Sequence, residues 1–356
     1  MGQERMGEFS KIIIKSVNWI GDAIMTTPTI RLIRRGFPQA KLTLLARKSV
    51  APVFANNPDI DEVWLEDEVE GEAPNGHGRF RKMRKLIERM RGESFDLGFA
   101  LPNSLGAAYL LWAGEVKRRI GYARDLRSPL LTDPVSCTRT ILSCHQVEYY
   151  LNLLHPVLSM DDEPRELVLN VAGKTVVRVD ALLEEQGIGR AERLIGINPG
   201  AFYGTAKRWL PERFAETADR VARSSGGRIV LNGSASERET ADEIVRKCEE
   251  PAVNMAGVLS LAEAVALIDR CAIFITNDSG GMHLAAARNA PTVAIFGSTD
   301  WRTTYPYSPA SRIVRHDTPC APCLLRECPI DHRCMTRVTV AEVVAAAEQL
   351  LTVKAE

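Results

Sequence analysis

The chain has 356 residues, and its 45 Lys and Arg residues balance 45 Asp and Glu residues. This length predicts two domains rather than one, and 45% apolar with 25% charged residues excludes a disordered, fibrous or coiled-coil chain. The formal net charge of +0 argues against bulk electrostatic binding of nucleic acid. We find no run of about 18 apolar residues that could span a membrane, and the apolar run at 12–14 lacks a cleavage site after it. A cytoplasmic protein is expected, with peripheral membrane contact at most.

The first half of the sequence alternates strand-like and helix-like segments. Apolar, β-branched runs predict strands at 11–17, 41–46, 62–65 and 95–101. Apolar residues at helical spacing predict helices from Asp22 to about Arg35 and at 79–91, 104–113 and 145–158. An acidic stretch at 161–164 then begins a linker that we expect to end near residue 174.

The second half repeats this alternation more regularly. Strands are predicted at 194–198, 228–232, 272–276 and 292–296, and helices at 211–224, 236–248, 260–270, 281–288 and 341–351. Nearly all-apolar strands separated by helices are typical of parallel sheets covered on both faces. The sequence therefore predicts an α/β protein with two doubly wound domains, at 1–165 and 175–336, followed by a C-terminal helix. Ligands in such folds bind beyond the carboxyl ends of the strands, so the strand-to-helix turns are the places to look for chemistry.

The turn at 18–22 places Asp22 at the start of a predicted helix. A helix dipole stabilises the ionised carboxylate there, and such a carboxylate can accept a proton from a hydroxyl group. An Asp that only caps the helix is the alternative interpretation. The turn has no G-x-G-x-x-G pattern, so a dehydrogenase-type dinucleotide site is poorly supported.

Three turns of the second half carry groups suited to a nucleotide. The loop after strand 194–198 contains Thr205 and Lys207, which could face a diphosphate, although a solvated basic loop is the alternative. Glu237 follows another strand and could accept hydrogen bonds from a ribose, or only complement the helix dipole. The turn after strand 272–276 combines glycines, hydroxyl and carboxylate groups at a helix N-terminus, a typical anion site, through Asp278, Ser279, Gly280, Gly281 and His283.

Three motifs carry a resemblance to a known family: SVNWIGD at 16–22, NPGA at 198–201 with AKRW at 206–209, and TNDSGGMH at 276–283. In order and spacing they resemble the bacterial lipopolysaccharide heptosyltransferases, glycosyltransferase family nine, and most closely the branch that adds the second heptose. The resemblance spans almost the whole chain. It implies a GT-B fold, in which two Rossmann-like domains face a cleft and a C-terminal helix packs back towards the N-terminal domain.

The resemblance also implies a reaction and roles for its residues. The donor would be ADP-heptose, the acceptor the lipopolysaccharide inner core, and the reaction inverting, with no cofactor required. Asp22 would be the general base, Lys207 with Thr205 would contact the donor phosphates, and Glu237 the ribose. The donor site would also be lined by Asp278, Ser279, Gly280, Gly281 and His283.

An anionic acceptor calls for cations in the N-terminal domain. Candidates for acceptor binding are Asn103, Arg119, Arg124 and Arg127, since Arg side chains suit carboxylate and phosphate oxygens. A second basic group lies at 79–85, and either group could also hold the protein on an anionic inner-leaflet surface. For both groups, a merely solvated surface is the alternative. No nucleic-acid partner is expected.

Four of the eight cysteines, Cys320, Cys323, Cys328 and Cys334, lie close together near the C-terminus. Four thiolates could bind a structural zinc ion or an iron–sulfur cluster. The spacing is not that of a standard zinc ribbon, so free thiols or adventitious disulfides remain the alternative. We expect no catalytic metal.

Three other functions compete with heptose transfer. A related transferase could use a different nucleotide sugar or add a different core heptose, because neither base nor sugar is fixed by the residues. A sugar-nucleotide epimerase would not need the arginines proposed for the acceptor. A non-catalytic nucleotide-sugar-binding protein is disfavoured by the presence of both Asp22 and Lys207, because a protein that only binds needs no base.

Overall fold

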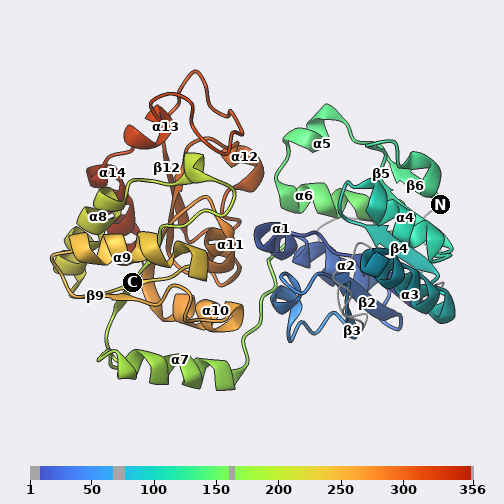
Figure 1. Ribbon diagram of the computed structural model, residues 1–356, viewed down its shortest axis with the longest axis horizontal. Coiled ribbons are helices and arrows are strands. Elements are labelled where there is room, and N and C mark those ends of the chain that lie inside the picture. Colours follow the sequence, from blue (N-terminus) through green and yellow to red (C-terminus); the bar gives the residue numbers. More distant parts are fainter. Residues whose placement is uncertain (1–8, 67–76, 160–164, 354–356) are drawn as a thin grey trace. The chain divides into compact units, whose positions relative to one another are not determined.

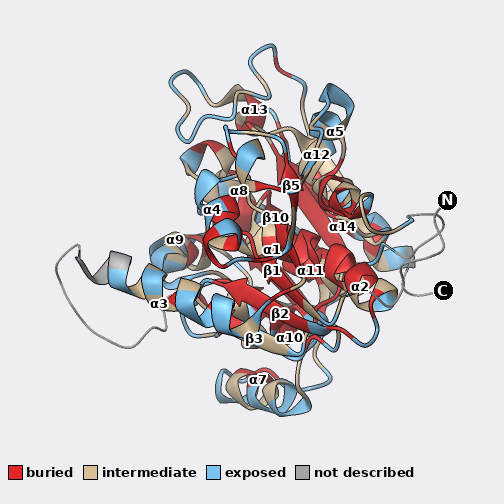
Figure 2. Cartoon of the chain, turned by 90° about the vertical axis from the view of Figure 1, so that its right-hand side faces the viewer, coloured by how far each residue is buried: buried red, intermediate tan, exposed pale blue. Residues whose placement is uncertain are grey.

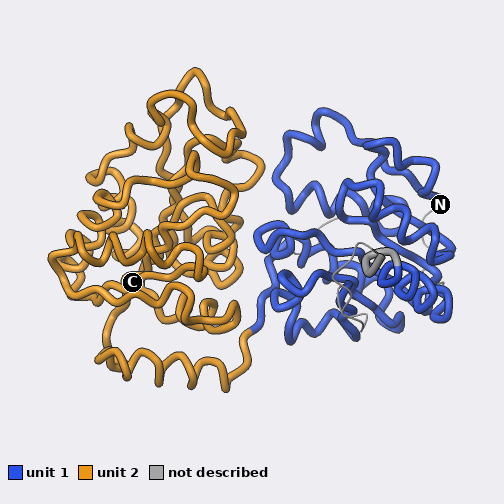
Figure 3. Tube along the Cα trace, viewed as in Figure 1, with its two compact units in different colours: residues 1–170 blue, residues 171–356 orange. Residues whose placement is uncertain are grey.

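The computed structural model describes residues 9–66, 77–159 and 165–353, and among these the side chains of 77–80 and 353 are left undescribed. The chain forms two compact units, residues 1–170 and 171–356 (Figure 3). The acidic stretch at 161–164, where the predicted linker begins, lies outside the described residues. Each unit is described by itself below.

Unit 1 is built on a six-stranded parallel sheet with the strand order β3-β2-β1-β4-β5-β6 (Figure 1). Its strands are β1 (Lys11–Lys15), β2 (Lys41–Ala46), β3 (Glu62–Leu65), β4 (Leu97–Ala100), β5 (Arg118–Tyr122) and β6 (Asp133–Val135). The central residue Ile13 pairs with Thr43 on one side and Gly98 on the other. Burial on both faces explains why β1 and β2 are almost wholly apolar (Figure 2).

The main helices of unit 1 are α1 (Ile20–Met25), α2 (Thr27–Gly36), α3 (His77–Glu93), α4 (Leu105–Ala113), α5 (Arg139–Ser143) and α6 (Gln146–Leu151). The single helix predicted to Arg35 is divided at Thr26, and Pro28 lies in the first turn of α2, where proline is tolerated. α4 begins where the sequence predicts, because the hydroxyl of Ser104 accepts a hydrogen bond from the Ala107 amide. The helix predicted over 145–158 ends at Leu151 and continues as a 3-10 turn.

α3 and α4 pack on the same face of the first sheet. Leu86 and Met90 of α3 and Ala108 and Leu111 of α4 belong to one buried cluster with Ile13 of β1. The outward-facing residues of both helices are therefore parts of one surface, in which α3 is largely basic.

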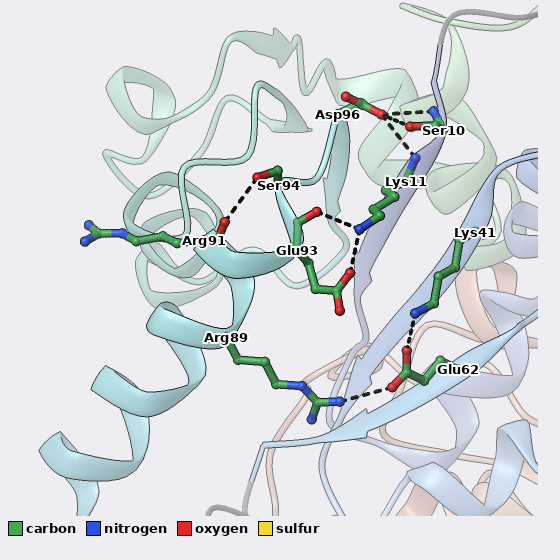
Figure 4. A network of polar contacts seen from close by, with 9 residues as sticks. All are labelled: Ser10, Lys11, Lys41, Glu62, Arg89, Arg91, Glu93, Ser94 and Asp96. Carbon is green, nitrogen blue, oxygen red and sulfur yellow. Dashed lines mark hydrogen bonds and ion pairs between the residues drawn. The ribbon is translucent and has the colours of Figure 1, made fainter.

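A polar network ties together the amino ends of the strands of unit 1 (Figure 4). The Asp96 carboxylate accepts hydrogen bonds from the amide and hydroxyl of Ser10 and from the Lys11 amide, and it pairs with Lys117. Burial works against ionisation of Asp96, but the hydrogen bonds from Lys117 and Ser10 prevail and hold its pKa well below the usual range. Nearby, Glu62 pairs with Lys41 and Arg89. The network fixes the end of the sheet opposite to the strand-to-helix turns.

Unit 2 contains a second six-stranded parallel sheet, with the order β12-β11-β10-β7-β8-β9. Its strands are β7 (Leu194–Asn198), β8 (Arg228–Leu231), β9 (Ala252–Asn254), β10 (Cys271–Asn277), β11 (Thr292–Phe296) and β12 (Ser311–Arg315). The predicted α/β class, with two doubly wound parallel sheets, is thus confirmed. Four strands were not predicted: β6 and β9, which have only 3 residues each, and β5 and β12, which each contain two arginines.

The helices of unit 2 include α7 (Gly173–Glu185), α8 (Pro211–Ser225), α9 (Arg238–Lys247), α10 (Leu261–Arg270), α11 (Gly280–Ala287), α12 (Trp301–Thr304), α13 (Arg333–Thr336) and α14 (Val340–Val353). The C-terminal helix α14 packs on α8 and on β10, β11 and β12. Its residues Val343, Ala347 and Leu350 are buried in the same cluster as Phe214 of α8. These contacts make α14 part of the core of unit 2. The expected packing of this helix towards the N-terminal domain stays a prediction. Across the described chain, every helix is too short or too polar to cross a bilayer.

Candidate active site

Asp22 lies in the first turn of α1, just beyond the carboxyl end of β1. The N-cap position is held by Trp19, so Asp22 is not the N-cap residue that the alternative interpretation assumed. Burial, and after it the charge of Asp22, raises the pKa of Tyr150 well above its ordinary value, which places the carboxylate near this phenol of α6. Asp22 is half-buried and stands in the positive field of the helix N-terminus. It is suited to act as an ionised base.

A charged cluster that the sequence analysis did not identify lies at the same edge of the sheet. The Lys15 ammonium, at the end of β1, is 2.7 Å from the Glu66 carboxylate, just beyond β3. These side chains are only 6% and 15% exposed. Arg47, just beyond β2, approaches the same carboxylate at 3.4 Å. The sequence did contain a sign of this charged cluster, because Lys15 is a charged residue at the end of a largely apolar strand.

Two of the residues predicted to bind the acceptor form a buried network beyond the ends of β4 and β5. Arg127 is 0% exposed, and it donates hydrogen bonds to the carbonyls of Tyr122, at 2.7 Å, and Pro102. It also donates to Oδ1 of Asn103 at 3.1 Å, which accepts a second hydrogen bond from the Tyr149 hydroxyl at 3.0 Å. Since its guanidinium is enclosed by protein oxygens, Arg127 holds this turn together.

The other two candidates for acceptor binding are separated. Arg124 follows β5, is partly exposed and hydrogen-bonds the side chain of Tyr149, so it remains available at the carboxyl edge. Arg119 lies at the amino end of β5, and its guanidinium donates to the carbonyls of Leu130 and Val116. The structure therefore does not bring Arg119 together with the other predicted residues.

In unit 2, Lys207 forms an ion pair with Asp278. Lys207 lies in a 3-10 turn at Thr205–Lys207, and its ammonium is 2.6 Å from Oδ2 of Asp278. The two side chains are 16% and 5% exposed. The same oxygen accepts a hydrogen bond from the Thr299 hydroxyl at 2.6 Å, a contact that the sequence analysis missed. Thr205 at the start of the turn is exposed.

The turn after β10 has the geometry of an anion site. Ser279 is the N-cap of α11, and Gly280 and Gly281 form the first turn of this helix, where backbone amides have no partner within the helix. A side chain at Gly281 would collide with Oδ1 of Asn198, 2.8 Å from the position of a Cβ atom, so only glycine fits there. His283 is buried one turn further into the helix.

Three asparagines at strand ends join these turns. The Asn232 amide donates to Oδ1 of Asn198, and the Asn198 amide donates to the Ser279 hydroxyl. Asn277 donates to the Pro199 carbonyl and accepts from the Trp209 amide. The sequence analysis assigned these residues no role, although each stands at the end of an apolar strand. They fix the loop that carries Lys207 against the N-terminus of α11.

Glu237 forms a capping box with Ser234. The amide and hydroxyl of Ser234 lie 2.7 and 2.8 Å from Oε2 of Glu237. The other oxygen, Oε1, faces Gly200, where a Cβ atom would be 1.8 Å away. The carboxylate thus caps its own turn and also reaches the loop after β7, so one of its oxygens borders the candidate donor site.

The thiols of the Cys-rich segment are not gathered around one point. Within the described ranges, no three His, Cys, Asp or Glu side chains are grouped to hold a metal ion, so this arrangement lends no support to the structural zinc suggested for Cys320, Cys323, Cys328 and Cys334, which stays a prediction. Cys334 is buried and Cys320 exposed, so the thiols do not share one environment. Burial, and then the neighbouring thiols, raises the pKa of Cys334 to about 11. Cys334 is therefore a neutral thiol at neutral pH.

Comparison with known proteins shows the family of this chain. Residues 83–333 match the model of glycosyltransferase family 9 (heptosyltransferase). Lipopolysaccharide heptosyltransferase 2 of Salmonella typhimurium and that of Escherichia coli K12 are each 30% identical over 86% of this chain and 88% of their own length. The structure of E. coli ADP-heptose lps heptosyltransferase II has a TM-score of 0.81 at 27% identity, covering 97% of this chain and 100% of that one. The chain belongs to glycosyltransferase family 9, the heptosyltransferases.

Proposed function

We propose that this heptosyltransferase transfers heptose from ADP-heptose to the inner core of lipopolysaccharide, adding the second heptose. The observation that carries this proposal is the Lys207–Asp278 pair beside the glycine-rich N-terminus of α11, a site suited to a sugar diphosphate. The relatives at 30% identity are named lipopolysaccharide heptosyltransferase 2 and a similar solved structure is named ADP-heptose lps heptosyltransferase II, which supports this choice of acceptor and donor. Two possibilities compete with this proposal: the addition of a different core heptose, and the use of another nucleotide sugar.

In the proposed reaction, Asp22 takes the proton of the acceptor hydroxyl. The freed oxygen attacks the anomeric carbon on the face opposite to ADP, forming the new glycosidic bond while the bond from the anomeric carbon to the phosphate oxygen breaks. The configuration is thereby inverted. Positive charge develops on the sugar in the transition state, as in glycoside hydrolysis.

The departing ADP gains negative charge, which Lys207 and the first-turn amides of α11 would stabilise. Asp278 would help to hold the heptose, Thr205 a phosphate oxygen, and Glu237 the ribose. His283 would line the site from within α11. In this mechanism the chain's own cations and amides stabilise the leaving group, so no metal ion has a role in it.

For the acceptor, we propose Arg124 as a direct contact with its anionic groups, with Asn103 beside it at the carboxyl edge of β4. Arg124 is partly exposed and held by Tyr149. Arg127 would act only through the turn that it stabilises.

We also propose that the surface formed by α3 and α4 rests on the anionic cytoplasmic leaflet of the inner membrane, because the acceptor is lipid-anchored. The exposed basic residues of α3 are Arg81, Arg84, Arg89 and Arg91. Arg79, which belongs to the basic group expected at 79–85, lies outside the described side chains. On α4, three large side chains one helical turn apart are exposed by 52%, 38% and 49%: Leu105, Tyr109 and Trp112. Basic residues beside exposed aromatic ones suit an anionic lipid surface.

Calorimetric titration with ADP-heptose, ADP and UDP-glucose tests the donor, and transfer to a core acceptor with one heptose tests the reaction. Selective binding of the adenine nucleotides followed by transfer is expected. Binding without transfer would refute the proposed acceptor, and absence of adenine-nucleotide binding would refute the donor. For the membrane surface, co-sedimentation with phosphatidylglycerol vesicles should fall in an Arg81→Glu/Arg84→Glu variant and remain low for neutral vesicles.

A further inference from the structure

The Cys-rich segment is attached to the loop that carries Lys207. Ala206, the residue directly before Lys207, is 1% exposed. Its amide donates to the carbonyl of Arg326 at 3.0 Å. Its carbonyl lies 3.0 Å from Nε2 of His332, and since a carbonyl only accepts, Nε2 carries the proton in this contact. Both backbone groups of Ala206 are therefore bonded to the segment 324–332.

One further hydrogen bond joins the same two segments, and another joins the Cys-rich segment to the loop after β11. The Tyr203 hydroxyl donates to the carbonyl of Leu324 at 2.8 Å, and the Leu324 amide donates to the carbonyl of Ser298 at 2.9 Å. At Gly204, a Cβ atom would lie 2.1 Å from the carbonyl oxygen of Arg326. The loop can approach the segment this closely only because residue 204 has no side chain.

The aromatic ring of Tyr203 lies beside two cations. The Lys207 ammonium is 5.3 Å from the ring centroid, and the guanidinium of Arg326 is 5.5 Å from it, both within the range of a cation–π interaction. The segment thus contacts the Lys207 loop through its backbone on one side and through Tyr203 on the other.

His332 itself is held in an unusual conformation. Its φ angle is 54°, in the left-handed region that few residues other than glycine and asparagine adopt. Its amide donates to Sγ of Cys328 at 3.3 Å, which ties the turn to the cysteine cluster. A left-handed turn at this residue directs the imidazole to Ala206 and not to the solvent.

We propose that the Cys-rich segment sets the position of Lys207 for the donor diphosphate, and that His332 is the positioning residue through which it does so. This inference rests on the proposed function, because it takes Lys207 as a diphosphate ligand. His332 does not touch the donor in the proposal. It acts by fixing the Ala206 carbonyl, one residue before the ammonium-bearing side chain.

The test is a double-mutant cycle read out as the Kd for ADP. His332→Ala should weaken ADP binding by roughly five- to tenfold, the range expected when a partly buried hydrogen bond is lost. In the Lys207→Ala background the same substitution should change the Kd by less than about twofold, because residues that act as one unit are not additive. His332→Gln, whose amide can donate to Ala206 from a similar place, should restore most of the affinity.

His316→Ala is the matched control, since His316 belongs to the same part of the chain but bonds Glu342 instead. It should leave the Kd for ADP unchanged. Tyr203→Phe, which removes the contact with Leu324 but keeps the ring, serves as a second and milder variant, and thermal melting verifies that each variant is folded. In kinetics, His332→Ala should raise the KM for the donor more than it lowers kcat.

The outcomes distinguish this inference from the proposed function. No ADP binding by the unaltered protein would refute the proposed function. If Lys207→Ala weakens ADP binding while His332→Ala and Tyr203→Phe do not, the inference is wrong and the proposed function stands. An equal effect of His332→Ala with and without Lys207 would also overturn it, because it would show a structural role independent of the ammonium.

Discussion

The ammonium of Lys207 and the carboxylate of Asp278 lie 2.6 Å apart, and both are largely withdrawn from solvent. Lys207 comes from the loop after β7 and Asp278 from the turn after β10, so the pair joins two neighbouring strands at their carboxyl ends. The positive charge that we propose for binding a diphosphate is thus balanced by a neighbouring carboxylate. In the proposed site a donor phosphate would share Lys207 with Asp278, and donor binding would then be linked to the stability of unit 2.

Replacing Asp278 with Asn should separate these two effects. A buried cation left without its partner is strongly destabilising, and we expect the free energy of unfolding to fall by about 3 kcal/mol, measured by chemical denaturation. ADP should nevertheless bind at least as tightly as in the unaltered protein, because the carboxylate no longer competes for Lys207. Heptose transfer should fall. Thr299→Val, which removes only one hydrogen bond to Asp278, is the control and should cost about 1 kcal/mol. Clearly weaker ADP binding by the Asn variant would contradict this account.

Arg127 and Arg124 lie three residues apart, and replacing each with Met should affect different properties: stability for Arg127 and acceptor binding for Arg124. Arg127→Met leaves the carbonyls of Tyr122 and Pro102 without their buried donor, so the free energy of unfolding should fall by roughly 2–4 kcal/mol. Arg124→Met should change stability by less than about 1 kcal/mol but raise the KM for the acceptor. Denaturation curves and acceptor kinetics of the two variants provide the comparison. A stable Arg127→Met protein with a raised acceptor KM would reverse the two assignments.

The sequence predicted an element correctly where its residue types are compatible with few local structures. The apolar runs of β1, β7 and β11 predicted their strands, and the glycines after β10 predicted a helix N-terminus, where Gly280 and Gly281 form the first turn of α11. The sequence could not show which arginines are buried. Arg127, inside the turn, and Arg124, at its edge, contribute the same charge to any pattern read from the sequence.

The position of Arg119 in the sheet could not be predicted, for a related reason. The strand β5 begins with two arginines and contains a glycine, so it lacks the apolar pattern of a buried strand and was not predicted. Without that strand, nothing indicated that Arg119 lies at the amino end of the sheet and Arg124 beyond its carboxyl end. The contacts of Thr299 with Asp278 and of His332 with Ala206 could not be predicted for another reason, since the paired residues are distant in sequence and meet only in the folded unit.

Asp96 should account for part of the acid sensitivity of unit 1. Its pKa is lower in the folded protein than in the unfolded chain, where an aspartate titrates near 3.9. The stabilisation is therefore fully present above about pH 4 and is lost as the pH falls from there towards the folded-state pKa. Asp96→Asn should lower the free energy of unfolding at pH 7 and flatten its decline between about pH 4 and 2. Urea denaturation at several pH values measures both. Parallel pH profiles for the two proteins would show that Asp96 contributes no such linkage.

Asp22→Asn should abolish most of the catalytic power while leaving the donor site intact. The amide has nearly the same shape but cannot accept the proton of the acceptor hydroxyl, and general-base catalysis contributes about 10²–10⁴-fold to a rate. We therefore expect kcat to fall by a factor in that range, with the Kd for ADP unchanged, because the proposed donor contacts all lie in unit 2. Single-turnover transfer and calorimetric titration measure the two quantities. Asp125→Asn, an exposed aspartate of the same unit, is the control for an unspecific loss of charge and should keep full activity. Turnover by Asp22→Asn within about twofold of the unaltered enzyme would mean that another group accepts the proton, and Tyr150 would not be that group, since its raised pKa keeps the phenol neutral.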